Sequence, residues 1–443
     1  MKRKQNFIQG PILPALLKFA LPVLLALLLQ AMYGAVDLQV VGKFGTAADI
    51  SAVSTGSQIM HSLTIIITSL AMGITVLLGQ KIGEGKPREA GAVVGGGICL
   101  FAVVTLIMTV VVLLAAPQLA AIMHAPEDAF DGTVTYVRLC AGGSAFIVAY
   151  NLLGSIFRGL GDSKMPLLTV FIACVLNIAG DLLLVASFGM GVAGAAIATV
   201  FAQAVSVLLS LLIIRRRELH FTLTRAELRF DGVIICRILR LGTPIALQEL
   251  LVSISFLVIT AIANAMGVVA SAGVGVAEKL CAFVMLVPSA YMQSMSAFVA
   301  QNIGAGREDR ARKALWTGIL SSLAAGALMF WAAFFHGDFL AGIFAEDPAV
   351  ILAGWEYLKA YAIDCLLTSF LFCFIGYFNG HGQTLFVMLQ GFAGAFGVRL
   401  PVALLVSSLS GSLFHLGLST PASSFVQIVL CMGYYLWNKG KRA

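Results

Sequence analysis

Two polar residues stand four positions apart in an otherwise apolar stretch, "VLNIAGDLLLV" at residues 175–185. They are Asn177 and Asp181, and on a helix this spacing puts both side chains on one face. Asp37 in "MYGAVDLQVVG" and Thr199 in "AAIATVFAQ" are set in similar surroundings. Two carboxylates, an amide and a hydroxyl suit Na⁺, whereas two acids held close together can instead keep a proton. The sequence predicts a site for a small cation and leaves Na⁺ and H⁺ open.

The composition indicates what surrounds these polar side chains. Of the 443 residues, 60% are hydrophobic and 11% are charged, and the mean hydropathy is +0.97. So much apolar surface cannot be hidden in the core of a water-soluble protein. We therefore expect an integral membrane protein whose surroundings are a lipid bilayer.

Twelve apolar stretches approach the roughly 20 residues that a helix needs to cross a bilayer. They are 14–42, 53–79, 91–116, 133–157, 165–187, 190–214, 238–266, 270–300, 314–335, 350–378, 384–408 and 413–437. The predicted fold is an all-α integral membrane protein with twelve transmembrane helices. Its basic and then apolar start imitates a secretory signal, but the apolar run continues through Asp37 to Val41, so we expect no cleavage.

The formal net charge of +7 is distributed unevenly between the loops. Lys and Arg gather at the amino terminus, at 81–88, 215–240 and 307–313, and in the tail. The alternate loops hold mostly acids: Glu127, Asp128, Asp131, Asp338, Glu346 and Asp347. Positive charge marks the cytoplasmic side, so both termini are predicted to be cytoplasmic, in a multi-pass protein of the inner cell membrane. Nucleic-acid binding is disfavoured, because these residues flank spans and lack interleaved aromatic residues.

An internal repeat organises the chain. With a shift of 221 residues, "GQKIGEGKPREA" at 79 falls on "AQNIGAGREDRA" at 300, "SIFRGLGDSK" at 155 on "GYFNGHGQTL" at 376, and "YVRL" at 136 on "YLKA" at 357. The two halves are therefore predicted to be one fold used twice, as parallel repeats. We expect a six-helix lobe at 1–214, a cytoplasmic linker at 215–237 and a second six-helix lobe at 238–443.

Depth and the repeat both favour a functional site in the first half. Asp37, Asp181 and Thr199 each fall about 5 to 9 residues from the outer end of a span, roughly 7 to 14 Å deep. An ionisable residue inside a span costs roughly 2.5 to 3.5 kcal/mol at mid-helix, so it needs a reason to be there. At the repeat positions of Asn177, Asp181 and Asp37 the second half has valines, namely Val398, Val402 and Val258. The fold thus does without these polar groups.

The second half has polar residues of its own within its spans, and two interpretations of them stay open. They are Glu249, Glu278, Asp364 and Arg399. Either Arg399 and Lys279 only neutralise the acids, or a net acidic cavity attracts a cationic substrate.

Other motifs have plainer interpretations. "GQKIGEGKP" has the wrong glycine spacing for a phosphate-binding loop, and we interpret it as a tight turn with glycine at positive φ. The eight cysteines never form CxxC and are interpreted as packing residues. Pro22 and Pro244 fall at matching places in the first span of each half and are predicted to bend those helices.

The chain resembles the multidrug and toxic compound extrusion (MATE) family over essentially its whole length. The resemblance rests on twelve spans in two lobes, Pro22 and Asp37 in the first span, the loops "GQKIGEGK" and "AQNIGAGR", "FRGLGDSK" after span four, and "NIAGD" in span five. It implies an efflux antiporter whose first lobe binds the coupling cation through Asp37, Asn177, Asp181 and Thr199. It also implies that Tyr33 and Asn151 belong to the cavity, and that Glu249 and Asp364 lie where some branches carry functional acids.

The sequence thus predicts export of an organic, cationic compound by alternating access, coupled to Na⁺ or H⁺, with no cofactor and no enzymatic activity. We expect a monomer. A flippase for a lipid-linked precursor is the alternative, but it would need more unpaired basic residues than Arg399, Lys279 and Arg138. An enzyme would need a catalytic constellation, and the six histidines show no metal spacing. A channel fits doubled six-helix lobes with an asymmetric acid site less well than a carrier does.

Overall fold

The computed structural model of the protein describes residues 7–216 and 227–442. Its elements, including the π-helices η1 and η2, are α1 (Ile12–Phe44), α2 (Ala47–Gly83), α3 (Pro87–Ile122), α4 (Glu127–Gly142), α5 (Ser144–Gly159), α6 (Lys164–Asp181), η1 (Leu182–Ser187), α7 (Gly191–Arg216), α8 (Gly232–Ala265), α9 (Val268–Val284), α10 (Leu286–Gly304), α11 (Glu308–Phe335), α12 (Gly337–Gly342), α13 (Pro348–Gly380), α14 (Thr384–Gly394), η2 (Ala395–Arg399), α15 (Leu400–Leu409), α16 (Leu413–Gly417) and α17 (Ser419–Arg442).

Eleven spans within the described residues are long and apolar enough to cross a membrane, and α4 and α5 together make a twelfth. These two helices meet at a bend of 59°, so the span predicted at 133–157 is a broken one. Helices also extend past the apolar stretches at both ends. α2, for example, begins at a Thr46 capping box, outside the predicted 53–79. The predicted all-α membrane fold is confirmed.

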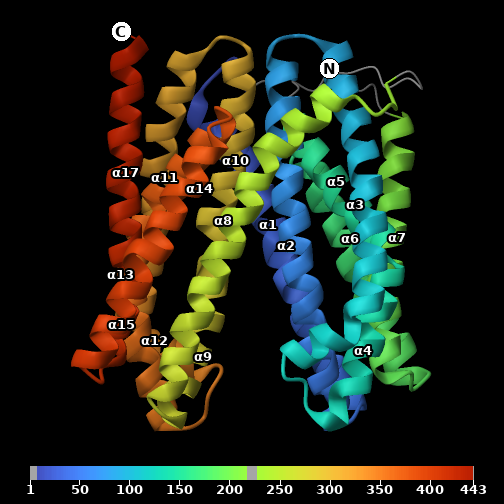
Figure 1. Cartoon of the computed structure of the whole chain (residues 1–443), viewed down its shortest axis with the longest axis vertical. Helices are drawn as coiled ribbons and strands as arrows, with labels where there is room; N and C mark the ends of the chain where they lie inside the picture. Colours follow the sequence, from blue (N-terminus) through green and yellow to red (C-terminus); the bar gives the residue numbers. More distant parts are fainter. Residues whose placement is uncertain (1–6, 217–226, 443) are drawn as a thin grey trace. The chain divides into compact units, whose positions relative to one another are not determined.

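The chain forms two compact units, and α1 and α8 are each shared between them. Unit 1 includes residues 21–243 and unit 2 includes residues 6–20 and 244–443. The divisions fall next to Pro22 in α1 and at Pro244 in α8, both inside continuous helices (Figure 1). The division at 214 and 238 stays a prediction, and part of the expected linker, 217–226, lies outside the described residues.

Small residues bring the helices of unit 1 close together. A Cβ on Gly159 of α5 would lie 3.0 Å from the Thr75 carbonyl oxygen of α2. At the same contact the Thr75 hydroxyl donates to the Ser155 carbonyl at 2.9 Å. Because lipid offers helices little hydrophobic driving force to associate, such close backbone approach and interhelical hydrogen bonds stabilise the bundle.

Unit 2 holds the start of the described chain. Phe7 is fully buried and its ring packs against Phe19 and Phe298, each with a centroid distance of 5.1 Å. The Arg310 side chain donates to the carbonyl oxygens of Phe7, Gln9 and Gly10 at 2.8, 3.2 and 2.7 Å. Residues 7–10 are thereby fixed to α11.

The repeated glycine loops form the same turns in both halves. Gly85 has φ of +69° and its repeat partner Gly306 has +68°; Gly161 has +80° and its partner Gly382 has +77°. Only glycine adopts these left-handed conformations without strain. The prediction of tight turns with glycine at positive φ is confirmed.

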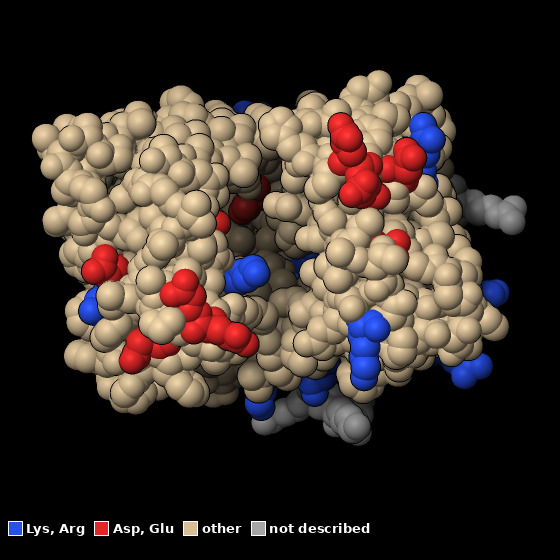
Figure 2. All heavy atoms as spheres, turned by 90° about the horizontal axis from the view of Figure 1, so that it is seen from below, with Lys and Arg blue, Asp and Glu red and all other residues tan. Residues whose placement is uncertain are grey.

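Charged and cysteine residues follow the sequence pattern. Figure 2, seen from below, shows acidic side chains on that face, where α4 and α12 lie in Figure 1. The exposed acids Glu127, Asp128 and Asp131 belong to α4, and Asp338 begins α12. All eight cysteines are free thiols and six are buried, as packing residues would be.

Candidate functional site

Three helices of unit 1 bring the four predicted ligands together. Asp37 comes from α1, Asn177 and Asp181 from the last turns of α6, and Thr199 from α7. The Thr199 hydroxyl donates to Asp37 Oδ2 at 3.5 Å, and Asn177 Nδ2 donates to Thr199 Oγ1 at 3.3 Å. Asp181 lies in side-chain contact with Asp37. Residues 162 positions apart thus form one polar cluster.

Oxygen atoms without hydrogen-bond partners converge in this cluster. Asp37, Asn177 and Asp181 are exposed by only 5%, 2% and 0%. Asp37 Oδ1, Asn177 Oδ1 and both carboxylate oxygens of Asp181 are buried and accept no hydrogen bond. Neither acid forms an ion pair with any residue that the structure describes. Buried carboxylate oxygens without donors are costly, and a small cation or a proton would satisfy them.

The local backbone explains how α6 presents these groups. Gly180 stands between Asn177 and Asp181, and a Cβ there would lie 2.9 Å from Ala198 Cβ of α7. Glycine therefore lets α6 approach α7 closely beside Thr199. Directly after Asp181 the helix widens into the π-helix η1, a distortion that is frequent at functional sites.

Tyrosines surround the cluster, and one of them was missed at the sequence level. Tyr33 of α1, a predicted cavity residue, lies within electrostatic range of Asp37 and beside Gln203. Tyr136 of α4 lies beside Thr199 and is only 3% exposed. The sequence did single out its position, because Tyr136 is the first residue of "YVRL", one of the motifs of the internal repeat.

Asn151, also predicted to be a cavity residue, bonds to other groups. Its Oδ1 accepts from the Thr68 hydroxyl at 2.9 Å and its Nδ2 donates to the Ile147 carbonyl at 2.8 Å. It thus bridges α2 and α5, and its role in a cavity stays a prediction.

Unit 2 has a buried cluster of mixed charge around Tyr357, the repeat partner of Tyr136. Glu278, Asp364 and Arg399 all lie within electrostatic range of the Tyr357 hydroxyl. Glu278 accepts from Thr260 at 2.9 Å. This cluster differs from that of unit 1 by containing a base.

Arg399 and Asp364 each keep an unpartnered atom. The guanidinium of Arg399 donates to Ser255 at 2.9 Å and lies 4.4 Å from the Phe256 ring centroid, while its Nε and Asp364 Oδ1 have no partner. Two other polar residues of the second half lie apart from this cluster. Glu249 has no charged neighbour among the residues that the structure describes, and Lys279 is exposed.

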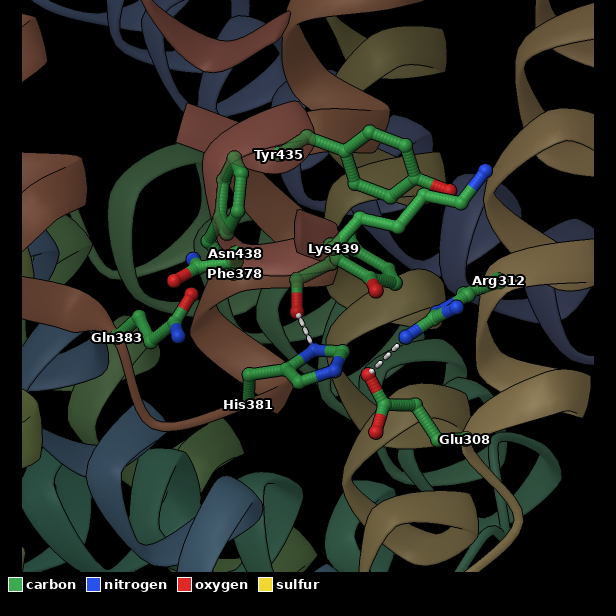
Figure 3. Close-up of a pocket in the computed structure, with 9 residues that line it drawn as sticks. Glu308, Arg312, Phe378, His381, Gln383, Tyr435, Asn438 and Lys439 are labelled. Atoms are coloured by element: carbon green, nitrogen blue, oxygen red, sulfur yellow. Dashed lines mark hydrogen bonds and ion pairs between the residues drawn. The ribbon is translucent and has the colours of Figure 1, made fainter. Parts of the chain in front are cut away.

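A small pocket lies elsewhere in unit 2 and contains none of the predicted site residues. It is lined by the ends of α11, α13 and α17 and by the turn before α14 (Figure 3). No sequence motif pointed to it.

Comparisons with known proteins agree with the repeat and the fold. The MatE family model matches twice, at residues 22–183 and 244–405, which confirms that the two halves are one fold. Similar relatives include "Probable multidrug resistance protein YoeA" of Bacillus subtilis, 26% identical, covering 95% of this chain and 93% of that protein. The "FAD transporter" of Shewanella oneidensis is also 26% identical, covering 98% of this chain and 96% of that protein.

Solved structures match the fold of the whole chain. "Crystal structure of MATE in the straight conformation" has a TM-score of 0.90 at 19% identity, covering 100% of this chain and 98% of that one. "Crystal structure of MATE in the bent conformation" matches equally well. With two matches of the family model across most of its length, the chain belongs to the multidrug and toxic compound extrusion (MATE) family of membrane transporters.

Proposed function

We propose that this MATE transporter is an antiporter that couples entry of Na⁺ or H⁺ to export of an organic cation. The observation that carries the proposal is the cluster of Asp37, Asn177, Asp181 and Thr199, with four buried oxygen atoms that lack donors. Two acids without a basic partner favour binding of a positive species. The names of relatives, such as "Multidrug export protein MepA" of Staphylococcus saprophyticus, support export of organic compounds.

Coupling follows from differential affinity. A cation that enters from outside and binds the carboxylate cluster more tightly in one state of the protein shifts the population toward that state, from which the organic substrate is released outward. The basic loops support a location in the inner cell membrane with both termini on the cytoplasmic side. The function requires a small organic substrate and a lipid bilayer as partners, and we propose that the protein acts as a monomer.

A second candidate is export of an anionic compound by the same ion-driven cycle. Arg399, buried with an unpartnered Nε, favours it, and a relative over nearly the full length is named "FAD transporter". A lipid-linked-precursor flippase is less well supported, because a pyrophosphate calls for several basic residues and Arg399, the base of the unit 2 cluster, lies within electrostatic range of Asp364.

Transport in proteoliposomes under separately imposed gradients tests the proposal. An inward Na⁺ gradient at equal pH, and an inward proton gradient without Na⁺, are each applied to vesicles that contain a fluorescent cationic dye or an anionic one. We expect one ion gradient to drive release of the cationic dye. Release of the anionic dye alone would favour the second candidate, and gradient-independent leakage of both dyes would refute coupled antiport.

A further inference from the structure

The pocket at one end of unit 2 combines charged and amide side chains with aromatic rings. Its lining comes from the first turns of α11, the end of α13, the turn before α14 and the end of α17. Figure 3 shows Arg312, Lys439, Asn438 and Gln383 around it. None of these side chains belongs to the two buried clusters.

Among the charged side chains that line this pocket, basic residues outnumber acids. Arg312 and Lys439 face a single acid, Glu308. Arg312 gives one bond of 3.0 Å to Glu308 Oε1, which leaves most of its five N–H donors for another acceptor. Lys439 forms no ion pair with the residues that the structure describes. Such a set fits a phosphate, which Arg contacts through two parallel bonds.

The surroundings of the pocket are those of a lipid-facing interface. The ring of Tyr435 lines the pocket and packs edge-on against Trp316, with a centroid distance of 6.3 Å. Trp437 on α17 is 55% exposed. Aromatic residues of this kind gather at the level of lipid head groups.

An apolar stripe continues from the pocket along α11. Arg312, Trp316 and Leu320 follow one another at intervals of four residues, on one face of the helix. Trp316 is 40% and Leu320 69% exposed. A lipid whose phosphate meets Arg312 would thus find apolar surface for its acyl chains.

Comparison with the first half shows that the fold does not require the polar residues of this pocket. At the matching positions of the first half, Gly91 stands for Arg312, Leu160 for His381 and Asp162 for Gln383. The same helix ends therefore form without the polar lining.

From these observations we propose that the pocket binds the phosphate head group of an anionic phospholipid through Arg312 and Lys439. Basic pockets between transmembrane helices on the cytoplasmic side suit such head groups. The site is separate from the proposed transport function and stands or falls independently of it.

The test uses Trp316 as a reporter beside the pocket. In the full chain, Trp331, Trp355 and Trp437 are replaced by Phe, and the protein is reconstituted in vesicles of brominated phosphatidylcholine with increasing unbrominated phosphatidylglycerol. Recovery of Trp316 fluorescence gives the binding constant of phosphatidylglycerol relative to phosphatidylcholine. We expect a preference of several-fold for phosphatidylglycerol.

Charge-matched variants identify the groups responsible. Arg312→Gln and Lys439→Gln should each lower the preference about fivefold or abolish it, while Arg312→Lys keeps a large part of it. Lys313→Gln removes the same charge from the adjacent, exposed position of α11 and should leave the preference unchanged. Circular dichroism establishes that each variant is folded.

Four results would overturn the proposal. Three come from the lipid titration: no preference in the starting protein, an equal loss in Lys313→Gln, and full retention of the preference in both Arg312→Gln and Lys439→Gln. The fourth comes from free phosphate. Inorganic phosphate added at constant ionic strength should not displace the lipid. If it removes the preference, the pocket selects free phosphate and not a lipid head group.

Discussion

The Thr199 hydroxyl links Asp37 and Asn177 in the proposed cation site. It donates to Asp37 Oδ2 at 3.5 Å and accepts from Asn177 at 3.3 Å. Both distances exceed the usual hydrogen-bond ranges, so both bonds are weak and the hydroxyl can turn its oxygen toward a bound cation at little cost. Asp37 and Asp181 supply the negative charge, and Thr199 helps to hold their geometry.

Removal of this hydroxyl should weaken ion binding without abolishing it. Thr199→Val keeps the shape of the side chain but loses one polar contact, a change of about 0.5 to 1.5 kcal/mol. We expect the half-saturating concentration of the driving ion to rise about 2- to 12-fold. Thr199→Ser keeps the hydroxyl and is the control. Equal ion dependence of the two variants would exclude Thr199 from the site.

At the residue scale the sequence was most informative about the polar groups inside spans. The polar groups of Asp37, Asn177, Asp181 and Thr199 were visible as exceptions inside apolar spans. At the matching positions of the second half, valines replace the first three, whereas Thr199 is matched by Thr420. Tyr136 was not predicted, since a buried tyrosine is unremarkable until the packing of α4 against α7 brings it beside Thr199.

Among the elements, α1 and α8 each have parts in both units. The first residues of α1 up to Ala20 count with unit 2, and the rest, with Asp37, counts with unit 1. The Arg310 bonds to residues 7–10 fix the chain just before this helix.

Loss of the Arg310 side chain should loosen the start of α1 selectively. Arg310→Ala removes three hydrogen bonds from a charged donor, worth about 2 to 5 kcal/mol in all. Hydrogen exchange should become faster at residues 7–20 and stay unchanged in α6. Arg307→Ala, an exposed neighbour with a weak pair to Asp309, is the control. Unchanged exchange at residues 7–20 in Arg310→Ala would contradict this account.

Close contact between α10 and α13 depends on Gly376. A Cβ at this position would lie 2.5 Å from the Met292 carbonyl oxygen, so Gly376→Ala should destabilise unit 2 by about 1 to 3 kcal/mol. Gly275→Ala in α9 meets no atom within 4 Å and should not destabilise the protein. Thermal unfolding in detergent compares the two variants, and similar midpoints would rule out a packing role for Gly376.

At the scale of the molecule, the two halves repeat one fold and differ in their polar content. Hydropathy and the repeat were sufficient to predict the spans, since lipid requires long apolar helices. They did not predict the 59° break between α4 and α5, the π-helices or the pocket beside Arg312. These features depend on side-chain packing between helices, which leaves no periodic signal in one sequence.

The two polar clusters differ in charge, and we propose that this difference decides which of them binds the driving ion. Unit 1 has two acids without a base, whereas Asp364 and Glu278 in unit 2 share their surroundings with Arg399. The account therefore assigns the driving ion to unit 1. Asp364→Asn should change substrate preference more than ion dependence, as measured by dye competition. A complete loss of ion dependence in this variant would contradict that assignment.

The most direct measurement is ion-driven dye release by Asp37→Asn and Asp181→Asn in proteoliposomes, beside the exposed control Asp128→Asn. The account predicts that both variants reach the membrane and bind dye, but lose gradient-driven release, while the control behaves as the unaltered protein. Undiminished gradient-driven release by Asp37→Asn or Asp181→Asn would contradict the account.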